Sequence, residues 1–181
     1  MAMQNATPAA GPDQSGAPTA SLSLVEAAVV CLRAAFPTSE IRAASAFGDS
    51  WAVVPGNLIV DACRALRDDP ATACNMLVDV TAVDLLPRAP RWEVVYNLLS
   101  LAHNARFRLK VEVEDGPEPL VPSVSSVYAG ANWYEREIFD LMGIRFSDHP
   151  DLRRILLPED WQGYPLRYDH PLGGEEVGFT S

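Results

Sequence analysis

Apolar residues recur at helical spacing in three stretches of the chain, which predicts three α-helices. The helices are expected over residues 24–35, 58–67 and 131–142. Ser23 and Glu26 stand at the positions of a capping box for the first helix, and Gly143 stands where the third should end. The residues expected to form the buried stripe of the third helix are Trp133, Ile138, Leu141 and Met142.

Five further stretches are typical of β-strands. They are residues 41–47, 51–54, 74–83, 91–101 and 106–114. The last alternates cleanly, with Phe107 and Leu109 on one side and Arg108 and Lys110 on the other, so one face of the sheet lies in water, as is usual for antiparallel pairing. The order of elements predicts an α+β fold, a single domain whose mostly antiparallel or mixed sheet of about five strands is flanked by helices.

The two ends of the chain differ in composition from this domain. Residues 1–20 are mainly small and polar with several prolines, which predicts a flexible tail and leaves residues 21–143 for the α+β domain. Residues 144–181 show no helical or strand period, yet they carry many large apolar side chains. Because long structureless stretches are uncommon within compact domains, this segment is predicted to be an extended C-terminal arm that binds a partner protein.

The charge of the chain limits its partners. The net charge is −10, which is unfavourable for binding the phosphates of nucleic acids or an anionic lipid surface. No apolar run approaches the roughly 18 residues that a membrane-spanning helix needs. The N-terminus also lacks the basic start and apolar region of a signal peptide. Membrane association is therefore expected to be indirect, through other proteins.

The cysteines offer little chemistry. Cys31, Cys63 and Cys74 are odd in number and have no CxxC spacing, which argues against a disulfide framework and against a zinc or iron–sulfur site made by this chain alone. Their apolar surroundings favour buried thiols. The sequence also lacks a nucleotide-binding glycine loop and an HExxH motif. We therefore assign no catalytic, cofactor-binding or metal-binding residue.

Carboxylates gather on the third predicted helix. Glu137 and Asp140 are three residues apart and share a helix face, and with His149 they could form the acid–base or metal site of a small acidic enzyme. The alternative is a charged helix face that pairs with the arginines following it. Spacing alone favours this second interpretation.

Arginine and aromatic residues characterise the predicted arm, and both are enriched where proteins bind one another. Arg153, Arg154, Trp161 and Arg167 are expected to contact the partner. The full set of expected docking residues, drawn from the third helix and the arm, is Glu135, Arg136, Glu137, Asp140, His149, Asp151, Arg153, Arg154, Trp161 and Arg167.

The same region carries a family resemblance. Its motifs are Glu135-Arg136-Glu137, Asp140-Leu141, Gly143-Ile144, Phe146, His149-Pro150-Asp151-Leu152-Arg153-Arg154-Ile155-Leu156, Pro158-Glu159-Asp160-Trp161, Gly163 and Pro165-Leu166-Arg167. Together with Leu-Val-Asp-Val-Thr-Ala-Val-Asp at residues 77–84, they make this sequence resemble the C-type subunit of respiratory NADH–quinone oxidoreductase, complex I. The sequence departs from the family at Asp148, where glycine is usual, and at Tyr168 and His170, where the usual run is Lys-Asp-Tyr-Pro.

The resemblance implies a non-catalytic subunit of the peripheral arm, one that docks onto the quinone-site D-type subunit and lies next to the cluster-bearing B-type subunit. Electron transfer from NADH to quinone and proton translocation then belong to the whole complex. FMN and the iron–sulfur clusters are expected in partner subunits, with no cofactor bound by this chain. The implied location is peripheral, on the cytoplasmic side of the inner or plasma membrane. An equivalent subunit of a membrane-bound hydrogenase, or of a dehydrogenase complex with another electron donor, stays open as an alternative.

Overall fold

The computed structural model describes residues 23–171, so the predicted tail at 1–20 and the last ten residues of the predicted arm lie outside the described residues. The elements in chain order are α1 (Leu24–Ala35), β1 (Arg42–Ala46), β2 (Asp49–Val53), the 3-10 turn η1 (Gly56–Leu58), α2 (Ile59–Asp68), β3 (Met76–Asp84), β4 (Trp92–Ser100), β5 (Ala105–Val113), β6 (Leu120–Pro122), α3 (Ala131–Met142) and β7 (Arg145–Ser147). These bounds confirm the three predicted helices and the five predicted strands.

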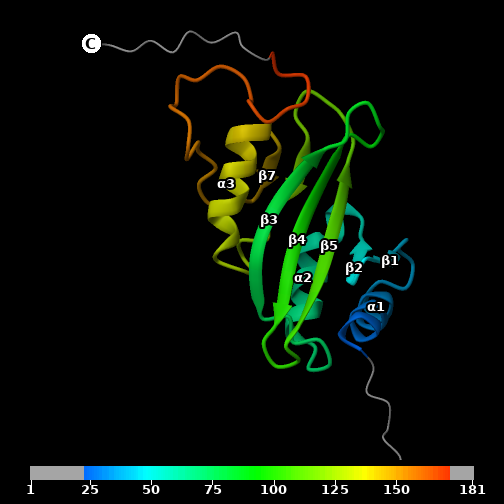
Figure 1. The fold of residues 1–181 in the computed structure, drawn as a ribbon. Coiled ribbons are helices and arrows are strands. Elements are labelled where there is room, and N and C mark those ends of the chain that lie inside the picture. The colour runs from blue at the N-terminus through cyan, green and yellow to red at the C-terminus, as the bar shows by residue number, and fades with distance from the viewer. Residues whose placement is uncertain (1–22, 172–181) are drawn as a thin grey trace, which may run out of the picture.

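The main sheet has five strands in the order β1-β2-β5-β4-β3. Every neighbouring pair is antiparallel except β2 and β5, which are parallel, so the sheet is mixed. In Figure 1, α2 lies behind β4 and β5, α1 lies at the lower right below β1 and β2, and α3 lies beside β3 at the edge of the sheet. The structure therefore confirms the predicted α+β fold.

Strand β4 shows how the two faces of the sheet differ. Trp92, Tyr96 and Leu98 point toward the helices and are completely buried. On the opposite face, the Lys110 ammonium on β5 lies 2.8 Å from the carboxylate of Glu93, and water reaches both. Alternation along the strands thus separates an apolar core from a charged face, as the sequence predicts. Among the cysteines, Cys63 and Cys74 are buried thiols and Cys31 is partly buried.

Local signals at the helix ends explain where the helices begin and stop. The Ser23 hydroxyl accepts from the Glu26 N–H at 3.3 Å, and the Glu26 carboxylate accepts from the Ser23 N–H at 2.9 Å. Helix α3 ends at Gly143, whose φ of 74° is left-handed and suits glycine. None of the helices within residues 23–171 is long and apolar enough to cross a membrane.

Two features differ from the sequence-based expectations. Trp133 was expected in the buried stripe of α3, but its side chain is 60% exposed, because the stripe is carried by Ile138 and Met142 further along the helix. Strands β6 and β7 were not predicted at all. They have three residues each and pair in parallel as a separate two-stranded sheet, which is too short to leave a visible period in the sequence.

Replacing Gly143 with alanine is expected to destabilise the chain by about 1–2 kcal/mol through the left-handed backbone alone. A further loss is expected because a Cβ atom here would lie 2.5 Å from the side chains of Arg167 and Tyr164. Urea unfolding measures the change. Gly116→Ala is the control, because a Cβ at that exposed position meets nothing within 4 Å. Equal tolerance of alanine at the two glycines would contradict this explanation.

Candidate functional site

The carboxylate of Asp140, near the end of α3, is the centre of the region that the sequence analysis singled out. It is completely buried. One oxygen lies 2.6 Å from Nη1 of Arg154, and the other accepts the backbone N–H groups of residues 155, 156 and 157 at 2.8–3.0 Å. Burial by itself would raise the pKa of Asp140, but these donors outweigh it and hold the pKa below its usual range. Asp140 therefore binds the arm to α3 as a fixed anion.

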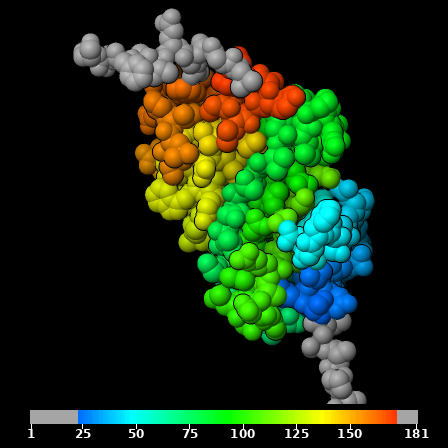
Figure 2. Space-filling model, in the orientation of Figure 1, coloured from blue at the N-terminus to red at the C-terminus, as the bar shows by residue number. Residues whose placement is uncertain are grey.

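Arg154 continues this network into the arm. Its second terminal nitrogen donates to the carbonyl groups of Trp161 and Gly163, each at 3.2 Å. From the helix side, Arg136 donates to the carbonyl groups of Arg153 and Arg154, each at 3.1 Å. Arg136 and Arg154 therefore satisfy backbone groups in a segment that has no helix or strand to do so. Figure 2 shows the arm (orange) packed against α3 (yellow) at one end of the molecule.

A second anchor lies where the arm passes the end of α3. Nε of Arg167 donates to the Met142 carbonyl at 2.7 Å, and the Leu166 N–H donates to the Leu141 carbonyl at 3.0 Å. These donors satisfy carbonyl groups that the last turn of a helix leaves without partners. The Arg167 guanidinium also lies over the rings of Tyr164 and Trp92, at 4.4 Å and 5.3 Å from their centres.

A third anchor joins the arm to the end of β3, and sequence reasoning missed it. Arg91, which is nearly buried, lies 2.8 Å from Asp84 and 2.9 Å from Asp169. Asp84 also accepts the backbone N–H of Tyr168 at 2.9 Å. Asp84 belongs to the stretch at 77–84 that carried part of the family resemblance, and that was the available signal. Spacing could not reveal this group, because Asp84 and Arg91 lie on either side of a turn and their partners in the arm are more than 70 residues away.

A buried polar cluster under α3 contains Glu135 and His149. The Glu135 carboxylate accepts the Ser123 hydroxyl at 2.6 Å and the Val124 N–H at 2.8 Å, while burial raises its pKa to about 7. The His149 side chain is also buried and lies 3.8 Å from Glu135. Nδ1 of His149 accepts from the Asp151 N–H at 3.0 Å, which leaves Nε2 to donate to the Asn132 carbonyl at 3.1 Å. The cluster holds the start of the arm against α3.

The three residues of the acid–base interpretation have separate partners. Asp140 is held by Arg154 and the arm backbone, and His149 is held by Asn132 and Asp151. Glu137 is exposed and lines a different hollow, between α3 and β3. Within residues 23–171, no group of three or more His, Cys, Asp or Glu side chains is placed to hold a metal ion.

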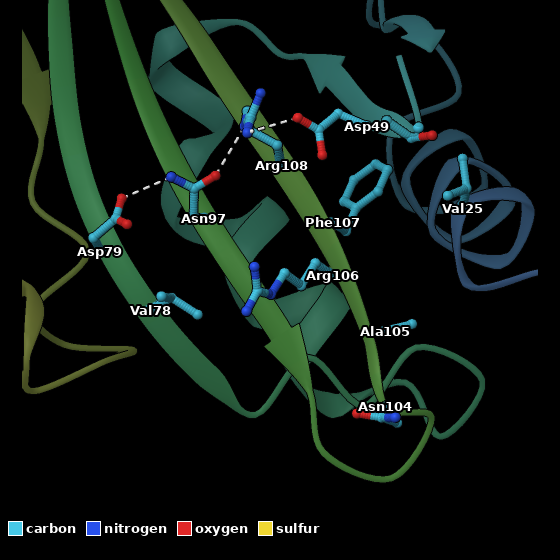
Figure 3. Close-up of a pocket in the computed structure, with 12 residues that line it drawn as sticks. Val25, Asp49, Val78, Asp79, Asn97, Asn104, Ala105, Arg106, Phe107 and Arg108 are labelled. Carbon is cyan, nitrogen blue, oxygen red and sulfur yellow. Dashed lines mark hydrogen bonds and ion pairs between the residues drawn. The ribbon is translucent and has the colours of Figure 1, made fainter. Parts of the chain in front are cut away.

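A concavity of about 620 Å³ lies on the open side of the sheet, beside β5 (Figure 3). A row of side chains crosses it. Asn97 donates to Asp79 at 2.7 Å and accepts from Arg108 at 2.8 Å, and Arg108 lies 3.3 Å from Asp49. These groups satisfy one another across four strands, which is typical of a solvated sheet face rather than of a reactive site.

The predicted docking residues therefore fall into two groups. Those that fold the arm onto its own domain are Glu135, Arg136, Asp140, His149, Arg154, Trp161 and Arg167. Those that face water are Glu137, Asp151 and Arg153. The arm also exposes Leu156, Leu166 and Tyr168, apolar side chains that the sequence analysis did not select.

Arg154→Ala and Arg153→Ala form a matched pair of variants. Arg154→Ala is expected to cost about 2–3 kcal/mol of folding free energy, because it leaves the buried Asp140 without its cation. Arg153 pairs with Asp151 in water, at 2.7 Å, so Arg153→Ala should change stability by less than about 0.5 kcal/mol. Urea unfolding of both variants measures the difference. Similar losses in the two variants would show that Arg154 does not anchor the arm.

Glu135 gives the folding free energy a pH dependence of a defined sign. Its folded pKa of about 7 lies above its ordinary value of 4.5, so the unfolded chain releases this proton first as the pH rises. Stability from this group is present at low pH and is lost between about 4.5 and 7. Glu135→Gln should remove this loss of folding free energy, which is about 3 kcal/mol. Unfolding curves of both proteins across this range measure it, and parallel pH profiles would refute it.

The sequence of this chain is similar to those of known respiratory-chain subunits. Residues 52–176 match the family described as respiratory-chain NADH dehydrogenase, 30 Kd subunit. The C-type subunit of NADH-quinone oxidoreductase from Roseiflexus sp. (strain RS-1) is 50% identical over 149 residues, which are 82% of this chain and 85% of the relative. The corresponding subunit of Geobacter sulfurreducens is 44% identical over 150 residues, 82% of this chain and 91% of the relative.

Two solved structures are similar in fold. A trypsin-resistant fragment of Nqo5 has a TM-score of 0.55 and 32% identity, and the match covers 68% of this chain and 97% of the fragment. A chain of the membrane-bound sulfane sulfur reductase, an archaeal respiratory membrane complex, has a TM-score of 0.65, 23% identity and coverage of 81% and 85%, a likeness of fold alone. Because the family match and the 50% identical relative both span most of the sequence, this chain belongs to the 30 Kd subunit family of respiratory-chain NADH dehydrogenase.

Proposed function

We propose that this chain is a non-catalytic subunit of a proton-translocating NADH–quinone oxidoreductase, where it positions neighbouring subunits. The observation that carries the proposal is the arm, which is fixed to the domain at Asp140, Arg167 and Asp84. Electron transfer requires cofactors at fixed separations, so a subunit with an arm held in this way can contribute by geometry alone.

The proposed partners are the quinone-site D-type subunit and the cluster-bearing B-type subunit. FMN and the iron–sulfur clusters are assigned to partner subunits, and the chain is placed at the cytoplasmic side of the membrane, peripherally and through the complex. The names of its relatives support membership of an NADH-quinone oxidoreductase. They also favour the NADH-oxidising complex over a related hydrogenase or a dehydrogenase with another donor. The fold alone would not make this distinction, because a chain of a sulfane sulfur reductase complex has a similar fold.

The docking surface proposed for the arm differs from the one expected from sequence. Arg154, Trp161 and Arg167 make their contacts inside the chain. The side chains available to a partner include Leu156, which is 62% exposed, and the exposed Arg153 in the same turn of the arm. An apolar side chain held on a fixed backbone is suited to a protein interface, because little conformational entropy is lost on binding.

Leu156→Arg and Leu101→Arg test the docking surface as a matched pair, because both leucines are 62% exposed. Leu156→Arg is expected to reduce the amount of chain recovered in the complex at least about tenfold, corresponding to roughly 1.4 kcal/mol. Leu101→Arg, in the loop after β4, should leave recovery unchanged. The measurement is affinity purification of the tagged full chain from mildly solubilised membranes, followed by native gel analysis and an NADH oxidation assay.

The same purification tests the function itself. Recovery of the unsubstituted chain in a large complex that oxidises NADH is the expected result. Recovery of a lone protein would overturn the proposed function. Recovery of a large complex without NADH oxidation would favour the assembly with another donor. Equal recovery of the two leucine variants would remove Leu156 from the docking surface and leave the proposed function standing.

A further inference from the structure

A groove of about 340 Å³ separates β3 from α3, and neither the sequence analysis nor the proposed docking surface uses it. One wall is the outer edge of β3 at residues 80–84, and the other is formed by Ile138, Leu141 and Met142 of α3. Leu166 and Tyr168 of the arm close one end. We name this feature the edge groove. In Figure 1, β3 is the outermost strand of the main sheet and lies beside α3.

The backbone of β3 presents to the edge groove hydrogen-bonding groups that have no partner within residues 23–171. The Leu85 N–H donates to the Arg91 carbonyl at 2.8 Å, which fixes the phase of the antiparallel ladder between β3 and β4. Hydrogen-bonded pairs then recur at every second residue, so Thr81 and Val83 bond to β4. The N–H and C=O groups of Val80 and Ala82 therefore point the other way, toward α3.

The open part of this edge has defined ends. At one end the Tyr134 hydroxyl donates to the Val78 carbonyl at 2.9 Å. At the other end the Tyr168 N–H donates to the Asp84 carboxylate at 2.9 Å. Between them the strand rises by about 3.3 Å per residue, so the stretch from Val80 to Asp84 is roughly 13 Å long. An extended segment of about four residues fits this length.

The walls of the edge groove specify the chemistry of an occupant. Ile138, Leu141 and Leu166 provide apolar contacts. Glu137 lines the groove from α3, is exposed, and forms no ion pair within residues 23–171. No lysine or arginine lines the groove. A suitable occupant is an extended segment with apolar side chains and a lysine or arginine opposite Glu137.

We propose that the edge groove receives an extended segment of a partner protein, which adds a strand beside β3. Its backbone pairs with the outward groups of β3 at Ala82, where the edge is partly exposed, its apolar side chains pack against Leu141, and its basic side chain pairs with Glu137. Strand addition of this kind takes affinity from the main chain and specificity from the side chains. The identity of the partner as another subunit of the complex rests on the proposed function.

Charge argues against the two occupants that this chain itself could supply. Residues 172–181 contain Glu175 and Glu176 and no lysine or arginine, so they would place like charges beside Glu137. A second copy would bring together two chains that each carry a net charge of −10. Mutual repulsion opposes both arrangements.

Residue-resolved hydrogen exchange on the full chain, alone and in the purified complex, tests strand addition directly. In the isolated chain the N–H group of Ala82, which is partly exposed, should exchange rapidly, while those of Thr81 and Val83 are protected by β4. Val80 is only 4% exposed and is therefore not used as a reporter. In the complex, exchange at Ala82 should slow by at least about a hundredfold, because exchange requires breaking the new hydrogen bonds. Unchanged exchange at Ala82 would overturn the proposal while leaving the proposed function intact.

Protection of the Ala82 N–H already present in the isolated chain would also overturn the proposal. It would indicate the chain's own terminal segment if it did not depend on protein concentration. If it rose with concentration, it would indicate a second copy. Failure to recover any complex is a different result, because it would count against the proposed function.

Two pairs of variants separate backbone pairing from charge. Ala82→Pro removes an outward N–H without breaking the ladder to β4, as proline is tolerated on edge strands, and Ala82→Ser keeps the N–H. Ala82→Pro should lower recovery in the complex at least about tenfold relative to Ala82→Ser. Glu137→Lys should likewise lower recovery in the complex relative to Glu114→Lys. Glu114→Lys makes the same charge change at an exposed site outside the groove. Equal recovery within both pairs would overturn strand addition. If Ala82→Pro fails to fold, the hydrogen-exchange measurement is the deciding test.

Discussion

The buried carboxylate of Asp140 is the interaction on which the arm depends. Residues 148–171 form no helix or strand, so their backbone groups need partners other than a regular ladder. Asp140 accepts three consecutive N–H groups at 155–157 and also holds Arg154, which donates to two carbonyl groups further along the arm. The Asp140 carboxylate thus fixes residues 155–157 directly, and through Arg154 it fixes the backbone near Trp161 and Gly163. A buried charge is costly unless fully paired, and here each oxygen has a donor.

The C-terminal end of the helix that carries Asp140 is itself fixed by the arm and by the small second sheet. Gly143 lets α3 end closely against Tyr164 and Arg167, and the chain then enters β7, which pairs with β6. Arg91 and Asp84 hold the last described part of the arm at the end of β3. The arm is therefore an extension of the folded domain. Its exposed apolar side chains are presented on a backbone whose position is set by these contacts.

The hydrophobic pattern predicted the three helices and the five strands of the main sheet because each is long enough to show its period. The three-residue strands β6 and β7 are too short for that. The sequence drew attention to α3 and the arm, but it did not reveal which groups Arg154 and Arg167 contact. Their partners, Asp140 and the Met142 carbonyl, lie 14 and 25 residues away, so side-chain spacing on one helix could not reveal them. The pairing of Arg91 with Asp169 of the arm was missed for the same reason.

The outer edge of β3 poses a separate constraint. Exposed strand edges tend to pair with other chains, and proteins usually cover or interrupt them. Here Tyr134 and Tyr168 occupy the two ends of the edge and α3 lies beside it, yet within residues 23–171 the outward backbone groups of the partly exposed Ala82 have no partner. Glu137 places a carboxylate at this opening, which disfavours the acidic chain's own segments and other copies of it. Both ends of this edge are covered, and the carboxylate of Glu137 repels other acidic chains. The edge is therefore suited to one short extended segment of opposite charge.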